Sequence, residues 1–199
     1  MLILASASPR RRTILQLAGL GHEVDPSGVD ETVETDDPVI EATEVALRKA
    51  SAVAARRPGA TVLGADTTTA VDGDSFGKPA DRDDARRMLH RLSGRSCLIT
   101  SGVALVEPGR QAAGAVSAVV HLRELTDDEI DAYVGTGAAD DKAAGLELQD
   151  RAADFVASTE GCPGAIIGLP LCALRDQLGL DVPECTHDRC LAGYGRLGG

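Results

Sequence analysis

Residues 62–79 place an acidic and a basic side chain where they could serve phosphate chemistry. The run 62–71 reads as a buried strand carrying Asp66, and Asp72-Gly73 is a strong hairpin signal because both central turn residues need positive φ. The returning chain carries Lys78 between glycine and proline. Such a hairpin can bring Asp66 and Lys78 to one end of a sheet, the carboxylate to hold a metal ion and the ammonium a phosphate. The alternative, from spacing alone, is that Asp66 ends a strand and Lys78 is a solvated loop lysine.

A second phosphate signal lies near the N-terminus. An apolar run at 2–5 predicts a strand, and Ser8-Pro9 predicts the start of a helix, with serine as N-cap and proline at the first helical position. The unpaired backbone N–H groups at such a helix start favour an anion, and Ser6 and Arg10 can add donors. Successive helical residues diverge by about 100°, so Arg10 and its two neighbouring arginines cannot all face one ligand, and at least one should be solvated.

Together these residues suit the hydrolysis of a phosphoanhydride. Asp66 and Glu31 could hold Mg²⁺ or Mn²⁺, which prefer oxygen ligands, polarise a phosphoryl oxygen and lower the pKa of a bound water. Lysines such as Lys78 and Lys142, with Arg10, would offset charge that builds on the phosphates. The sequence contains no P-loop motif, which argues against a P-loop NTPase. None of its four histidines stands beside a likely nucleophile, so serine-hydrolase chemistry is unsupported.

The elements that must position these groups alternate early and then become mainly strands. The pattern predicts strands at 2–5, 62–71, 97–106, 113–122 and 154–158, and helices at 9–18, 37–57, 81–92, 127–135 and 170–178. This order favours a mixed sheet flanked by helices. The predicted buried faces include Leu17 in the first helix and Val39 in the second. On pattern alone, Lys49 in the second helix is interpreted as solvated.

Composition excludes several classes of protein. The 199 residues carry a formal net charge of -11, which argues against a nucleic-acid binder with a broad basic face. No run of 18 apolar residues is present, so no membrane span is expected. Basic residues follow the first apolar run instead of preceding it, the wrong order for a signal peptide, which predicts a cytoplasmic protein. The five cysteines are then expected to be thiols, although Cys185, His187 and Cys190 leave a weak hypothesis of a zinc site in the tail.

Six motifs, taken together and in order, resemble the Maf family, the septum-formation-inhibitor-like nucleoside triphosphate pyrophosphatases. They are Leu4-Ala5-Ser6-Ala7-Ser8-Pro9-Arg10-Arg11, Gly64-Ala65-Asp66-Thr67, Gly77-Lys78-Pro79, Leu92-Ser93-Gly94, Asp141-Lys142-Ala143 and Gly168-Leu169-Pro170-Leu171. The resemblance covers residues 1–180 as one domain and leaves 181–199, with glycines and cysteines, as a tail. It implies an elongated α/β fold with two lobes and a cleft, similar to inosine triphosphate pyrophosphatases.

The resemblance also implies an activity and a set of site residues. It implies cytoplasmic hydrolysis of a nucleoside triphosphate to the monophosphate and pyrophosphate with a divalent cation (Mg²⁺, Mn²⁺ or Co²⁺), by a homodimer. From the composition, we expect neither nucleic acid nor membrane as a partner. It implies catalytic roles for Asp66, as general base, and Lys78, and metal ligation by Glu31 and Asp66. The residues that it implies bind substrate are Ser6, Arg10, Arg11, Lys49, Thr67, Lys142 and Gln149.

Base specificity is where the chain departs from the family pattern. Arg10, Thr67 and Gln149 match the branch similar to dTTP/UTP pyrophosphatases. The usual tyrosine and two glycines of the family are replaced by Leu146, Glu147 and Asp150. The altered segment leaves one alternative, a nucleotide-sensing protein of cell division without turnover. A second alternative, a pyrophosphatase for deaminated or methylated purine nucleotides, rests on the implied fold relationship.

Overall fold

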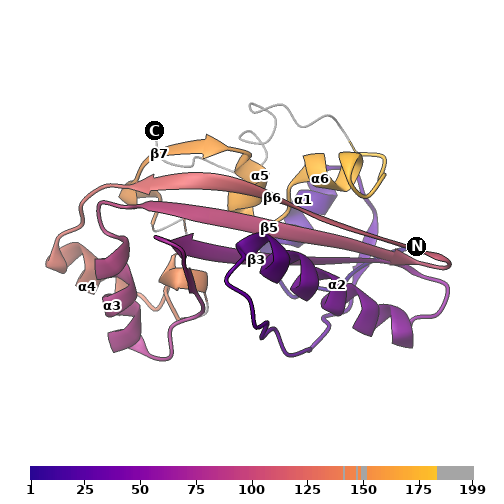
Figure 1. The fold of residues 1–199 in the computed structure, drawn as a ribbon, viewed down its shortest axis with the longest axis horizontal. Coiled ribbons are helices and arrows are strands. Elements are labelled where there is room, and N and C mark those ends of the chain that lie inside the picture. The colour runs from indigo at the N-terminus through magenta and orange to yellow at the C-terminus, as the bar shows by residue number, and fades with distance from the viewer. Residues whose placement is uncertain (141, 147, 149–151, 183–199) are drawn as a thin grey trace.

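The computed structural model describes residues 1–140, 142–146, 148 and 152–182, and it shows a mixed sheet flanked by helices (Figure 1). The strands are β1 (Leu2–Leu4), β2 (His22–Val24), β3 (Thr61–Val71), β4 (Asp74–Phe76), β5 (Ser96–Glu107), β6 (Arg110–Leu122) and β7 (Val156–Gly161). The helices are α1 (Pro9–Leu17), α2 (Pro38–Arg56), α3 (Arg82–Leu92), α4 (Asp127–Gly135), α5 (Pro163–Ile167) and α6 (Leu171–Asp176), with 3₁₀ turns at Ala143–Gly145 and Ala153–Phe155. Within this part of the chain, no helix is long and apolar enough to cross a membrane.

The sheet combines parallel and antiparallel pairing, as predicted. Its order is β2-β1-β3-β5-β6-β7, with β4 paired to β3 off this path. The short β1 is parallel to both β2 and β3, whereas the long β5 is antiparallel to both of its neighbours, β3 and β6. Asp72 (φ 53°) and Gly73 (φ 90°) form the predicted hairpin turn between β3 and β4.

One edge of β3 is open along its middle. The partners of β1 on β3 end at Leu63, and the partners of β4 begin at Thr69. Among the described residues, the stretch 64–68 therefore pairs only with β5. This opening lies between two strands that cover the rest of the same edge, and it exposes Asp66 and Thr67 to side chains from other elements.

Local hydrogen bonds explain where the helices begin. Ser8 accepts a hydrogen bond from the backbone of Arg11 at the start of α1, and Asp37 caps α2 in the same way. Thr126 and Glu129 form the predicted capping box of α4. These three caps confirm the helix starts expected from the sequence.

The helices divide the core into clusters on two faces and at one end of the sheet. Helix α2 packs on one face, against Ile3, Val62 and Ala104, while α1 and α6 pack on the other through Leu15 and Leu174. Helices α3 and α4 close a further cluster at the end of β5 and β6, and the long strands run through both regions (Figure 1). The core thus has two regions, one around α1, α2 and α6 and the other around α3 and α4, as expected for an α/β fold with two lobes.

The sequence placed some side chains and boundaries wrongly. Leu17 is 61% exposed, because it lies about 200° around α1 from the buried Leu15. Val39 is 46% exposed, because it belongs to the first turn of α2, before the helix meets the sheet at Ala42. The last strand spans Val156–Gly161 instead of 154–158, and α6 ends at Asp176 instead of 178. The pairing of β7 with β6 sets the bounds of this strand, since His121 faces Ser158 and Ala118 faces Gly161.

Candidate functional site

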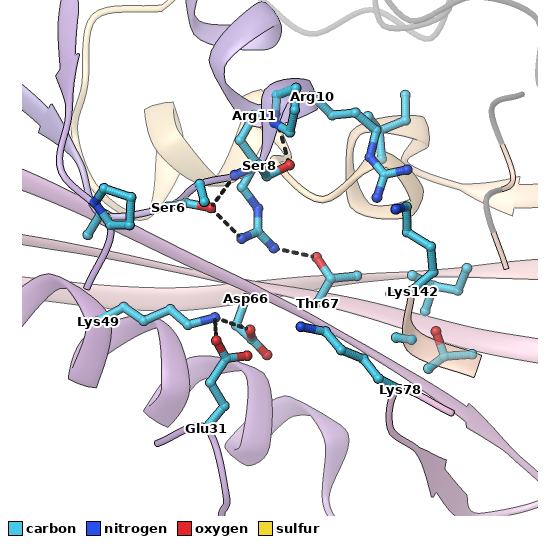
Figure 2. A pocket seen from close by; sticks show the side chains of 18 of the residues that line it. Ser6, Ser8, Arg10, Arg11, Glu31, Lys49, Asp66, Thr67, Lys78 and Lys142 are labelled. Atoms are coloured by element: carbon cyan, nitrogen blue, oxygen red, sulfur yellow. Dashed lines mark hydrogen bonds and ion pairs between the residues drawn. The ribbon is translucent and has the colours of Figure 1, made fainter. Parts of the chain in front are cut away.

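A cavity of about 670 Å³ lies at the open stretch of β3 (Figure 2). Its walls come from the turn after β1, the loop before α2, α2 itself, β3, the loop after β4 and the segment around Lys142. Nearly all the predicted site residues line it: Ser6, Arg10, Arg11, Glu31, Lys49, Asp66, Thr67, Lys78 and Lys142. Gln149 lies outside the described residues, as do Glu147 and Asp150.

Lys49 joins the two predicted acidic residues. Its Nζ atom lies 2.7 Å from Oδ1 of Asp66 and 2.9 Å from Oε1 of Glu31. The side chains of Lys49 and Asp66 are 8% and 12% exposed, whereas that of Glu31 is 51% exposed. The interpretation of Lys49 as solvated is therefore wrong: it lies on the sheet-facing side of α2, among the alanines and valines that bury this helix.

Two glycines bring α2 close enough for this contact. A Cβ atom on Gly64 would lie 2.1 Å from the carbonyl oxygen of Ala46, and one on Gly102 would lie 2.2 Å from that of Ala42. Gly102 is also the partner of Asp66 across β3 and β5. The helix backbone thus rests directly on the sheet, and Lys49, one turn beyond Ala46, reaches Asp66.

The donor set around Lys49 fits a hard divalent cation bound together with a substrate. Lys49 contacts one oxygen of each carboxylate, so the second oxygens of Asp66 and Glu31 could bind a cation beside the ammonium. Mg²⁺ is commonly bound by one or two carboxylates plus water and substrate phosphates, so two carboxylates suffice. Among the described residues there is no group of three or more His, Cys, Asp or Glu side chains that could hold a metal without substrate.

The three arginines at the start of α1 have different surroundings. Arg10 and Arg11 are half-buried and line the cavity, whereas Arg12 is exposed and lies outside its lining. This confirms that they do not all face one ligand. Figure 2 shows Arg10, Lys78 and Lys142 on the side of the cavity away from Lys49.

Arg11 is held by protein acceptors. Its Nε donates to the carbonyl of Gly168 (2.9 Å), Nη1 to Ser6 Oγ (3.0 Å) and to the carbonyl of Ala65 (2.8 Å), and Nη2 to Thr67 Oγ1 (3.0 Å). Burial lowers the pKa of the Arg11 guanidinium, and the charge of Asp66 opposes that shift. An arginine nevertheless keeps its proton in a protein, so Arg11 is a half-buried cation.

Ser6 presents a donor to the cavity. Its Oγ accepts from Arg11 Nη1 and, at 3.3 Å, from the backbone N–H of Ser8. Since a hydroxyl oxygen has two lone pairs and one hydrogen, Ser6 can add only a donated bond. Ionised phosphate oxygens are acceptors, so this polarity matches a phosphate ligand.

Sequence reasoning did not single out Ser101. Ser101 is fully buried opposite Thr67, with its Oγ 2.9 Å from Thr67 Oγ1 and 2.7 Å from the carbonyl oxygen of Ala165. The only available signal was the polar Thr100-Ser101 pair inside an otherwise apolar predicted strand. Such a pair is common in strands and carries no functional meaning without its partners.

The cysteines outside the cavity form one close pair in the described part. Cys162 and Cys172 have their sulfur atoms 3.7 Å apart, and this contact and burial raise the pKa of the Cys172 thiol. Both are reduced thiols, as expected. The hypothesis of zinc at Cys185, His187 and Cys190 falls outside the described residues.

Comparison of the sequence with known proteins gives matches that agree with one another. The family model for Maf-like proteins matches residues 1–180. A dTTP/UTP pyrophosphatase of Symbiobacterium thermophilum is 47% identical over 171 residues, which cover 85% of this chain and 88% of that protein. A dTTP/UTP pyrophosphatase of Thermococcus onnurineus is 43% identical, covering 86% of this chain and 92% of that protein. A nucleoside triphosphate pyrophosphatase of Parasynechococcus marenigrum is 41% identical, covering 89% and 94%.

Among solved structures, a nucleoside-triphosphatase, or dITP/XTP pyrophosphatase, of Mycobacterium abscessus shares 20% identity with a TM-score of 0.40. It covers 69% of this chain and 95% of that chain.

Proposed function

Since the chain belongs to the Maf-like protein family, we propose that it is a hydrolase that cleaves a nucleoside triphosphate into the monophosphate and pyrophosphate. The observation that carries the proposal is the grouping of opposite charges in one cavity: the carboxylates of Asp66 and Glu31 on one side, and Arg10, Lys78 and Lys142 on the other. A polyphosphate needs cations along its length, and water attack needs a base beside the reacting phosphorus.

Asp66 is the proposed general base. Its Oδ1 is held by Lys49 at 2.7 Å, which leaves Oδ2 as the atom that takes the proton from the attacking water. The water oxygen bonds to the α-phosphorus, and the bond from that phosphorus to the bridging oxygen breaks. The bridging oxygen leaves with pyrophosphate.

The cations and the hydroxyl of Ser6 hold the phosphates. Lys78, Lys142 and Arg10 offset the charge that develops on the leaving pyrophosphate, and Ser6 donates to a phosphate oxygen. Glu31 and Asp66 would hold a divalent cation (Mg²⁺, Mn²⁺ or Co²⁺), which supplies polarisation of a phosphoryl oxygen when bound.

We propose a pyrimidine nucleotide, dTTP or UTP, as substrate. This rests on relatives named dTTP/UTP pyrophosphatases that are 43–47% identical, and on the match of Arg10 and Thr67 to that branch. Glu147 and Asp150 are the residues of this chain that could alter the choice of base.

The deciding experiment measures pyrophosphate release from dTTP, UTP, CTP, ITP and 7-methyl-GTP, each with Mg²⁺, Mn²⁺ or Co²⁺ and with a chelator. Asp66→Asn is the blank, and we expect it to lose about 10²–10⁴-fold in rate. Release from purines alone would overturn the choice of base. Tight nucleotide binding without pyrophosphate release from any of these nucleotides would mean that the protein is a nucleotide sensor and not an enzyme.

We also propose a single domain over 1–180, a homodimer and a cytoplasmic location. Light scattering in solution tests the dimer. Fractionation of cells tests the location.

A further inference from the structure

At the open edge of β3, the side chain of Arg11 makes a hydrogen bond that a neighbouring strand would otherwise make. The carbonyl of Leu63 accepts from the N–H of Ala5 at 2.8 Å, where the chain leaves β1. The carbonyl of Ala65, two residues further and on the same edge by alternation, accepts from Arg11 Nη1, also at 2.8 Å. A side chain therefore satisfies a backbone acceptor that no neighbouring strand reaches.

The same guanidinium connects segments that are distant in the sequence. Besides Ala65 it binds Ser6 in the turn after β1, Thr67 on β3 and the carbonyl of Gly168 in the loop between α5 and α6. That loop approaches so closely that a Cβ on Gly168, whose φ is 106°, would lie 3.0 Å from Thr67 Oγ1. The planar fork of an arginine can bridge acceptors in this way, whereas the single nitrogen of a lysine cannot reach them all.

Ser101 determines the direction of the hydrogen bonds beyond Arg11. Its one hydroxyl hydrogen is donated to the carbonyl of Ala165 at 2.7 Å, so in the 2.9 Å contact with Thr67 it is Thr67 that donates. Arg11 Nη2 donates to Thr67 Oγ1 in turn. The hydrogen bonds thus run one way, from Arg11 to Thr67, then to Ser101 and to Ala165.

We infer that Arg11 and Ser101 are positioning residues, which act through Thr67 to hold the open stretch of β3, and with it Asp66, in place at the cavity. Ser101 is 0% exposed and cannot touch a substrate. Arg11 uses four of its five N–H donors on protein acceptors, which leaves one for a substrate in the cavity, so we assign it mainly this positioning role instead of the direct substrate contact expected from the motif. The effect on turnover rests on the proposed function. The series of hydrogen bonds from Arg11 to Ala165 does not depend on it.

The test compares Ser101→Ala with a matched control, Thr100→Val. Thr100 is the preceding residue of β5, is also 0% exposed, and shares a hydroxyl contact of 2.8 Å with Ser117, on the opposite face of the sheet. We expect Ser101→Ala to lower kcat about tenfold while KM for the triphosphate stays within about twofold, since misplacement of reacting groups can cost up to ~10²-fold. Thr100→Val should keep kcat near wild type. Equal kcat values in both variants would overturn the inference.

A double-mutant cycle tests the series of hydrogen bonds without measuring turnover. Thr67→Val and Ser101→Ala should shift the midpoint of thermal unfolding non-additively, because each removes the same contact, while Thr67→Val and Thr100→Val should add. Additive shifts for the first pair would overturn the inference even in a protein without activity. A wild-type protein that releases no pyrophosphate but shows the non-additive cycle would refute the proposed function alone.

A second variant keeps the inference testable if Ser101→Ala does not fold. Arg11→Lys keeps the charge but cannot bridge the four acceptors, so we expect kcat to fall with KM little changed. A raised KM with unchanged kcat would mean that Arg11 binds substrate, and would overturn the positioning role.

Discussion

The ammonium of Lys49 lies 2.7 Å from Oδ1 of Asp66, and the pair is almost completely buried at the open edge of β3. Glu31 approaches the same ammonium at 2.9 Å from the solvent side. One buried cation therefore orders both carboxylates of the candidate site. Its position depends on how closely α2 packs on the sheet.

Replacing Lys49 by Met should leave two carboxylates facing each other without a partner. Loss of one member of a buried ion pair typically costs about 3–5 kcal/mol, so we expect a large fall in the free energy of unfolding as well as loss of activity. Urea unfolding measures the first. Addition of Mg²⁺ or Mn²⁺ should restore part of the stability, because a divalent cation can occupy the point where the carboxylates meet. A variant as stable as wild type without metal would contradict the importance of this pair.

Gly64→Ala should separate α2 from the sheet. The added methyl would meet the carbonyl oxygen of Ala46 at 2.1 Å, a backbone atom that can move only with the helix. Overpacking of this kind costs about 1–3 kcal/mol, and the moved helix should carry Lys49 away from Asp66 and reduce kcat. The control is Gly135→Ala in α4, where an added Cβ would meet nothing within 4 Å. We expect the control to unfold at or above the wild-type temperature; equal effects in both variants would refute the argument.

Lys78→Met and Lys142→Met should weaken the hold on the triphosphate. Each removes a cation from the cavity wall, so we expect kcat/KM to fall. The dependence of kcat/KM on salt should become shallower, because fewer positive charges remain for salt to screen. Arg12→Gln, at an exposed position outside the cavity, is the matched loss of one positive charge. If that control lowered kcat/KM as much, the effect would come from net charge and not from the site.

The capping box of α4 should contribute to stability only above strongly acidic pH. Hydrogen bonds from Arg123, and then from the backbone of Thr126, lower the pKa of Glu129 from 4.5 to about 2. Because the folded-state pKa is the lower one, this contribution is present above about pH 4.5 and is lost as the pH falls towards 2. The difference in unfolding temperature between wild type and Glu129→Gln should therefore be constant from pH 7 to 5 and shrink below it. A difference that persists at pH 2 would show that the ionised carboxylate is not its source.

Much of the scaffold could be predicted because its signals are local. Ser8, Asp37 and Thr126 cap helices through hydrogen bonds to residues two or three positions away, and Asp72-Gly73 turns a hairpin between adjacent strands. Interactions of this range depend on residue type and spacing, which a sequence displays directly. The same holds for the ordered motifs that indicated the Maf family, since a family pattern is a property of the sequence.

The sequence by itself thus determined the family, the mixed sheet, most helix starts and the charged side chains in the described lining of the cavity. Only the tertiary structure decided their roles. It buried Lys49 between two carboxylates, turned Arg11 onto protein acceptors, and recruited Ser101, 34 residues from Thr67. The physical reason is that these contacts depend on the register of β3 with β5, on where β1 ends, and on the glycines that admit α2, none of which a periodic pattern along one segment specifies.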